Sequence, residues 1–285
     1  MKSNSSGFAM TNPVIGKMVK KTSEMEPDKS LGTASYSGIA NKTLFFMATT
    51  VIGVVLYFIL HQYLLSVSPA DMIVDFVDEN EIFAIHMSLY EVGVLILAGV
   101  LALIMPLAAW LLRSTIPVTG VLFTVSQGYF IGCISEFLVP EYKWIGILAL
   151  VLTIAIVGVM LFLYAKRIVR VTKRFRTVMM VLFPSIIIGG FALFILGLIP
   201  GVRNAVEGLN SIMQNPVVSI ISSIVFIIIA ALFLLADFNA IEECVENGMP
   251  KKLEWMAAFG LAYTIIYIYF KILNLLLQLV NKSDK

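Results

Sequence analysis

The residues of this sequence that could do chemistry are a few charged and polar side chains inside or beside long apolar segments. Asp237 lies in the run Leu234-Leu235-Ala236-Asp237-Phe238-Asn239, and Glu242 follows about one turn later. A charged side chain at membrane depth costs about 2.5–3.5 kcal/mol on insertion scales, so each one is a candidate functional group. The alternative is that Asp237 only marks the end of a helix at the membrane surface.

The last apolar segment carries a stripe of polar residues. Gly260, Thr264, Tyr267, Lys271, Asn274 and Gln278 are spaced 4, 3, 4, 3 and 4 residues apart. This spacing places them on one face of a helix, while Leu, Ile, Phe and Val cover the other faces. We expect the stripe to face the protein interior or water, and Asp237 to meet it. The alternative for Lys271 is that its long side chain reaches the membrane surface.

Weaker candidates lie in the second and third apolar segments. Glu91 is about one turn into the second segment, and Gln127 and Glu136 belong to the third, where Glu136 stands near Pro140 and suits the membrane surface. The neighbouring small residues are Ser126, Gly128, Gly132 and Ser135. We expect these small residues to serve close helix packing. His61 and His86 have no carboxylate at ligand spacing, so no metal site is expected.

The segments that must position these residues are membrane-spanning helices. Of the 285 residues, 59% are hydrophobic and 13% are charged, about half the charged share of a soluble domain. Segments of the roughly 20 residues needed to cross the hydrocarbon layer occur at 44–66, 86–112, 117–139, 144–165, 177–199, 216–237 and 254–280. Because backbone groups must be satisfied internally in lipid, these segments predict an all-α membrane protein with seven helices. The expected organisation is a polar tail at 1–42, a helix bundle at 43–281 and a short tail at 282–285.

The distribution of charge predicts the orientation. Basic residues gather in the N-terminal tail (Lys2, Lys17, Lys20, Lys21, Lys29, Lys42) and in the connection 166–176, whereas the connection 71–81 carries five acids and no base. Basic connections stay in the cytoplasm, so the N-terminus is expected there. The C-terminus is expected outside, unless the last segment is re-entrant. The acidic connection 71–81 suits a cation funnel or a partner surface, although a solvated loop explains it more simply.

Several function classes are not expected. The sequence has no nucleophile motif, phosphate-binding glycine loop or zinc spacing, so an enzyme is not expected. The net charge of +2 gives no indication of a nucleic-acid partner. The expected surroundings are the lipid bilayer, with no bound cofactor.

Several stretches resemble the bacterial branch of the Bax inhibitor-1 family. They are 237–242, 248–251, 254–261 and 267–269 near the C-terminus, together with 37–43, 128–132 and 171–176 earlier in the chain. The resemblance implies a bundle in which six helices surround a seventh, located in a bacterial cell membrane.

The resemblance also implies a calcium leak gated by pH. In this family an acid at the end of the sixth helix faces an acid in the seventh, and the two share a proton. Asp237 matches the first position, but Lys271 stands where the second acid is expected, and Gln127 stands where the bacterial branch usually has Glu. A lysine opposite Asp237 would keep both groups charged and remove the titration. The alternative function is a non-conducting regulator that binds another membrane protein, such as a membrane protease.

Overall fold

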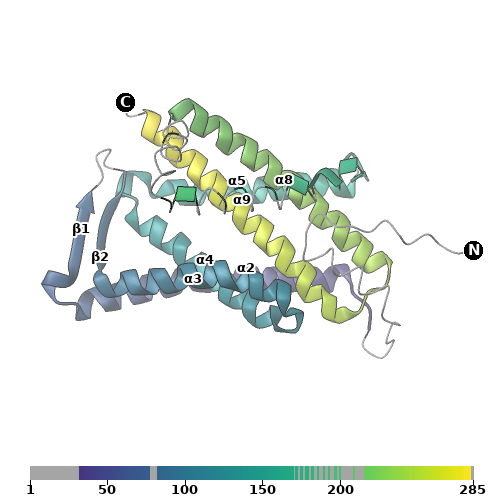
Figure 1. Cartoon of the computed structure of the whole chain (residues 1–285), viewed down its shortest axis with the longest axis horizontal. Helices are drawn as coiled ribbons and strands as arrows, with labels where there is room; N and C mark the ends of the chain where they lie inside the picture. The colour runs from purple at the N-terminus through teal and green to yellow at the C-terminus, as the bar shows by residue number, and fades with distance from the viewer. Residues whose placement is uncertain are drawn as a thin grey trace, which may run out of the picture.

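A computed structural model describes residues 32–77, 82–169 and 215–283, and scattered positions between 171 and 208 (Figure 1). Six long helices dominate the described part: α2 (Tyr36–Val67), α3 (Leu89–Leu111), α4 (Ile116–Phe137), α5 (Trp144–Ala165), α8 (Pro216–Glu246) and α9 (Glu254–Ser283). Two short strands, β1 (Ile73–Val77) and β2 (Ala84–Ser88), lie between α2 and α3.

Each of these six helices belongs to a segment that is long and apolar enough to cross a membrane. Six of the predicted spans are therefore confirmed, and the chain is an all-α multi-pass membrane protein. The predicted span 177–199 lies mostly outside the described residues, as does most of the predicted tail at 1–42.

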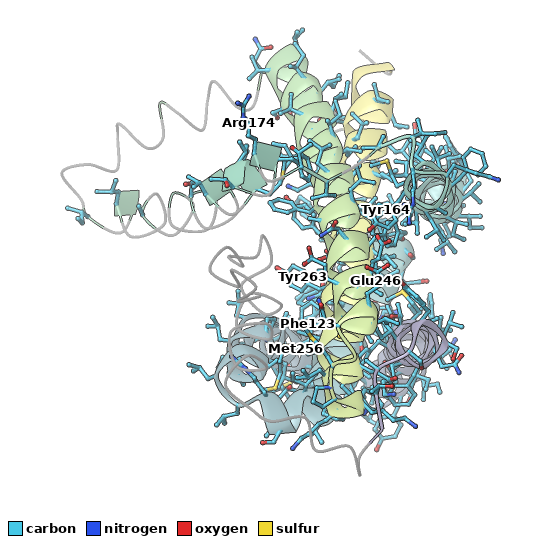
Figure 2. All side chains as sticks on the ribbon, turned by 90° about the vertical axis from the view of Figure 1, so that its right-hand side faces the viewer. Phe123, Tyr164, Arg174, Glu246, Met256 and Tyr263 are labelled. Atoms are coloured by element: carbon cyan, nitrogen blue, oxygen red, sulfur yellow. The ribbon has the colours of Figure 1, made fainter. Side chains whose placement is uncertain are left out.

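Helix α9 is the central helix of the described bundle. It packs against α2, α4, α5 and α8. In its most apolar window 67% of the residues are buried, against 11–50% in the other candidate spans. Its 30 residues form one continuous helix of about 45 Å, so no re-entrant turn interrupts it. Phe123 of α4 stacks on Tyr263 of α9 with ring centroids 5.3 Å apart (Figure 2).

Glycines bring α2 and α4 into close contact. A Cβ added to Gly128 would lie 1.9 Å from the backbone oxygen of Thr50, and one added to Gly53 would lie 2.2 Å from that of Val125. A Cβ on Gly132 would meet the ring of Tyr57 at 2.9 Å. Only glycine permits this backbone approach, which confirms the predicted packing role of Gly128 and Gly132 in the third span.

The connection after α2 forms a β-hairpin, which the sequence analysis did not predict. Strands β1 and β2 pair antiparallel, with Ile73 opposite Ser88 and Val77 opposite Ala84. The β-branched and aromatic residues of β1 favour this conformation. Residues 86–88, assigned above to the second span, belong to β2, and α3 begins at Leu89 after its N-cap Ser88.

Two helix boundaries differ from those expected. Helix α2 begins at Tyr36, before the expected boundary at residue 43, and Ser35 caps it by accepting a hydrogen bond from the Gly38 amide. Helix α8 continues to Glu246, well past residue 237. In both cases a polar side chain near the helix end has a partner on another helix: Lys42 of α2 contacts Glu254, and Glu242 of α8 contacts Tyr164. Each helix can therefore extend beyond its apolar segment.

Candidate functional site

Asp237 lies within α8 and faces the central helix. The residue is 2% exposed, and its Oδ2 accepts a hydrogen bond of 2.6 Å from the Thr264 hydroxyl of α9. The interpretation of Asp237 as a marker of the helix end is therefore wrong, because α8 continues for more than two turns beyond it. The expectation that Asp237 meets the polar stripe of the last helix is confirmed, and Thr264 is the residue that it meets.

Lys271 is not the residue opposite Asp237. It lies seven residues beyond Thr264, about 10 Å further along the α9 axis. Its ammonium nitrogen is 4.7 Å from the ring centroid of Phe226 on α8 and 5.3 Å from that of Tyr267. No ion pair joins Asp237 to Lys271, both of which the structure describes. Thr264 therefore contacts Asp237 where Lys271 was expected to do so, and the ammonium of Lys271 packs against aromatic rings instead.

The rest of the stripe runs along α8 and then reaches the surface. Ser223 of α8 donates a hydrogen bond of 3.2 Å to Gln278, which in turn donates to Asn274. Asn274 is exposed and Tyr267 is half-buried. The stripe is therefore interior at Thr264 and open to its surroundings at Asn274.

Glu242 connects α8 to α5 rather than to Asp237. It accepts a hydrogen bond from the Tyr164 hydroxyl, and one of its oxygens is 4.0 Å from Arg167. Figure 2 shows Tyr164 beside α8. The remaining candidates of the third span lie elsewhere: Gln127 is half-buried in α4, and Glu136 is 3.5 Å from Lys143 at the end of that helix, where its partly exposed side chain suits the membrane surface.

Glu91 forms the second buried carboxylate site, with His61 of α2. Glu91 Oε2 is 2.9 Å from His61 Nδ1, and their side chains are 0% and 8% exposed. The Tyr57 hydroxyl lies 3.4 Å from the same imidazole nitrogen, and the two rings stack 5.4 Å apart. This pair was not predicted, because its members are 30 residues apart on different helices. One feature of the sequence could have indicated the pair: His61 and Glu91 are each an isolated ionisable residue near the same end of neighbouring spans.

Two polar atoms of this region are buried without a hydrogen-bond partner in the part of the chain that the structure describes. They are Glu91 Oε1 and the Tyr129 hydroxyl. The ring of Tyr129 packs edge-on against Tyr57 at 5.1 Å, so both atoms belong to one polar cluster of α2, α3 and α4. We call Tyr57, His61, Glu91 and Tyr129 the α2–α3 cluster. The cluster thus brings an imidazole and a carboxylate into contact between two membrane-spanning helices.

A third buried carboxylate, Glu254, joins the beginning of α9 to the beginning of α2. Its side chain is 0% exposed and forms an ion pair with Lys42. Its other oxygen accepts hydrogen bonds of 2.9 Å and 3.2 Å from the backbone amide and hydroxyl of Ser35. A Cβ on Gly38 would lie 2.3 Å from Glu254, so only glycine leaves room for the carboxylate. The two sequence stretches 37–43 and 254–261 therefore meet in space through this contact.

Side chains that could bind a metal do not gather at one place in the described part of the chain. No three His, Cys, Asp or Glu residues among the described residues come together as a metal site. The three carboxylate sites above are each built from one acid with hydroxyl, imidazole or ammonium partners. Such sites can move protons or contact a passing cation, but they do not form a closed metal cage.

The comparisons with known proteins identify the family. No curated protein and no solved structure gives a significant match. A family model described as "Bax inhibitor 1 like" matches residues 12–281, which include every described helix apart from the last two residues of α9. The chain therefore belongs to the Bax inhibitor 1 like family.

Proposed function

We propose that this protein is a pH-modulated cation leak in a bacterial cell membrane, with its N-terminus in the cytoplasm and Ca²⁺ as the candidate permeant ion. The observation that carries the proposal is that two carboxylates, Asp237 and Glu91, are buried between helices, where Thr264 donates a hydrogen bond to the first and His61 lies beside the second. A buried acid between transmembrane helices is typical of an ion or proton pathway.

Asp237 is the proposed cation-contacting group. Thr264 donates a hydrogen bond to one carboxylate oxygen but brings no positive charge. Lys271 begins about 10 Å further along the α9 axis than Thr264, and its ammonium lies over the Phe226 ring, which reduces its repulsion of a cation near Asp237. The geometry thus weakens the main argument against a cation path, namely a lysine directly opposite the acid.

The α2–α3 cluster is the proposed pH-responsive element. In this family the resemblance implies a pair of acids at the sixth and seventh helices, whereas here Thr264 faces Asp237. We propose that the His61–Glu91 pair takes the place of that acid pair, because it joins a buried carboxylate to an imidazole between two helices. A change from one to two protons alters the charge between α2 and α3, and such a local change can bias two packing states of a bundle.

Calcium flux in proteoliposomes tests the proposal. Purified protein is reconstituted with a Ca²⁺ dye inside the liposomes, and flux is measured from pH 5 to pH 8. We expect pH-dependent flux that Asp237→Asn reduces at every pH and that Glu91→Gln makes independent of pH. Glu136→Gln is the matched control, because Glu136 is partly exposed beside Lys143. Absence of flux in the wild-type protein across this range would overturn the proposal.

A second pair of variants tests which residue of α9 is the functional counterpart of Asp237. Thr264→Asp places a carboxylate within hydrogen-bond reach of Asp237, so two acids must share a proton and a new pH dependence is expected. Lys271→Glu places a carboxylate about 10 Å away and is expected to add no such dependence. The opposite result would show that Lys271, and not Thr264, is the functional counterpart of Asp237.

A non-conducting regulator remains the second candidate, because the β-hairpin exposes apolar side chains. Phe76 is 56% exposed and Val74 is 39% exposed, both on β1 outside the described helices. Exposed apolar residues on a short strand suit contact with another membrane protein. The hairpin variant Phe76→Ser, compared in co-purification and in flux, separates the two functions: loss of a partner with no flux in any form would favour the regulator.

A further inference from the structure

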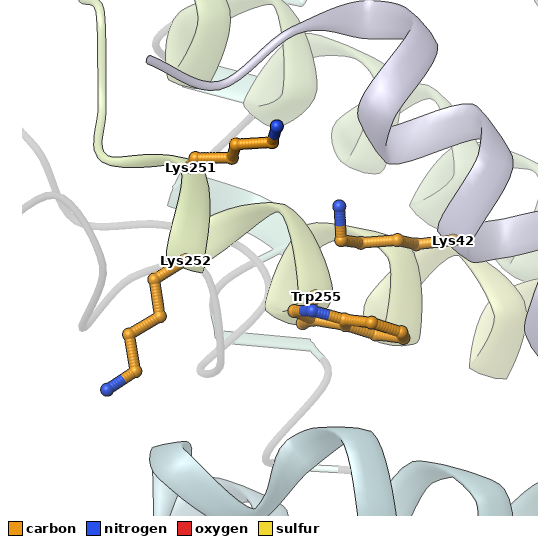
Figure 3. Close-up of a pocket in the computed structure, with 4 residues that line it drawn as sticks. All are labelled: Lys42, Lys251, Lys252 and Trp255. Carbon is orange, nitrogen blue, oxygen red and sulfur yellow. The ribbon is translucent and has the colours of Figure 1, made fainter. Parts of the chain in front are cut away.

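A basic hollow lies at the end of the bundle where α2 and α9 begin. Its volume is about 410 Å³, and it is lined by Lys42, Lys251, Lys252 and Trp255. Figure 3 shows the ammonium groups of Lys42 and Lys251 on the same side of the Trp255 ring, while the ammonium of Lys252 extends away from them. Three lysines beside one indole make this hollow suited to an anionic ligand.

The hollow is held in place by backbone and side-chain contacts. The Lys251 amide donates a hydrogen bond of 3.0 Å to the Gly32 carbonyl, and the Ala34 amide donates one of 2.7 Å to Met249. The ammonium of Lys42 lies 5.3 Å from the centroid of the Trp255 ring. These contacts fix the segment before α2 against the connection between α8 and α9, so the backbone that carries the lysines is set before any ligand binds.

The charge of the hollow remains positive after its internal ion pair is counted. Glu254 neutralises Lys42, but its carboxylate is 0% exposed and is already bound by Lys42 and Ser35. Lys251 and Lys252 are exposed and form no ion pair with the described residues. The ammonium of Lys251 can therefore meet a ligand in the hollow, and the ammonium of Lys252 adds positive charge at its edge.

Apolar surface continues from the hollow along α2. Leu44 is 64% exposed and Phe45 is 45% exposed, two and three residues after Lys42 in the sequence. Phe45 packs edge-on against Trp255 at 5.7 Å, which connects this surface to the wall of the hollow. Charged groups beside a membrane-facing apolar surface match the two parts of a phospholipid: the phosphate against the lysines and the acyl chain against Leu44 and Phe45.

We infer that this hollow binds the phosphate of an anionic membrane lipid. The ligand chemistry is a phosphate ester, and the apolar surface beside the lysines selects a lipid over a soluble phosphate. Lys251 and Lys252 supply the attraction, Trp255 occupies the headgroup level, and Lys42 stays paired with Glu254. Each lysine contributes about a fivefold change in affinity for an anionic surface lipid.

Native mass spectrometry of the full chain in detergent tests this inference. The probes are phosphatidylglycerol, phosphatidylcholine of the same acyl chains, and soluble glycerol phosphate. We expect selective retention of phosphatidylglycerol, reduced about 25-fold in Lys251→Ala/Lys252→Ala. Lys166→Ala, an exposed lysine after α5, is the matched control and should retain the lipid. The double variant leaves the Lys42–Glu254 ion pair intact, so its fold can be checked by unchanged thermal unfolding.

Three results would overturn the inference. Equal retention of phosphatidylglycerol and phosphatidylcholine would show that charge is not recognised. Equal loss of the lipid in Lys166→Ala would show that the attraction is not located at the hollow. Competition by glycerol phosphate at the same concentration as the lipid would assign the site to a soluble phosphate instead.

Discussion

Replacement of His61 by phenylalanine separates the hydrogen bond of the α2–α3 cluster from its packing. Phenylalanine keeps a ring to stack on Tyr57 but removes the nitrogen that lies 2.9 Å from Glu91. The other oxygen of Glu91 already has no partner among the described residues, so His61→Phe removes the imidazole hydrogen bond from a carboxylate that is poorly satisfied. A hydrogen bond to a charged group contributes about 1.5–3 kcal/mol, and this is the expected loss in the free energy of unfolding at pH 8.

Glu91→Leu, made both in the wild-type protein and in His61→Phe, isolates the interaction between His61 and Glu91. In the double variant the buried charge is absent, and replacing both members of a buried pair by apolar groups is often neutral. We therefore expect His61→Phe/Glu91→Leu to be more stable than His61→Phe alone, with a coupling energy of about 2 kcal/mol in the double-mutant cycle. Because the loss caused by His61→Phe arises from a buried negative charge, it should be smaller at pH 5 than at pH 8.

Reversible chemical denaturation in mixed micelles at both pH values measures these differences. Glu136→Gln is the matched control, because its partly exposed ion pair with Lys143 should change stability by less than about 1 kcal/mol. If His61→Phe is equally destabilising with and without the Glu91 carboxylate, the two residues do not interact as the structure shows. An unchanged loss at pH 5 and pH 8 would refute the proposed role of the buried charge.

Two further predictions concern helix contacts. Gly128→Ala should lower the thermal unfolding temperature strongly, because its Cβ would lie 1.9 Å from the Thr50 backbone oxygen, whereas Gly158→Ala, with no atom within 4 Å, should leave that temperature unchanged or raise it. Equal effects would contradict the close approach of α2 and α4. Glu254→Gln should lower the free energy of unfolding by about 3 kcal/mol, because it leaves the charge of Lys42 without its buried partner. A change below about 1 kcal/mol in a denaturant titration would show that this ion pair is solvated.

The sequence by itself determined the class of the protein and most of its helices. Long apolar segments predict membrane-spanning helices because the bilayer leaves the backbone no other way to satisfy its hydrogen bonds. The period of the polar stripe predicted that the last helix has an interior face, and the position of Thr264 opposite Asp237 confirms it. The glycines at 128 and 132 predicted close packing for the same kind of local reason. These features depend on neighbouring residues of one helix, so a single sequence shows them.

Only the tertiary structure decided which polar groups meet. The offset between α8 and α9 places Thr264, and not Lys271, at the level of Asp237, and a shift of two helical turns cannot be read from either helix alone. The pairs His61–Glu91 and Lys42–Glu254 join residues 30 and 212 positions apart. Their partners are chosen by how the helices pack, because an isolated charged residue carries no information about the distant group that will neutralise it.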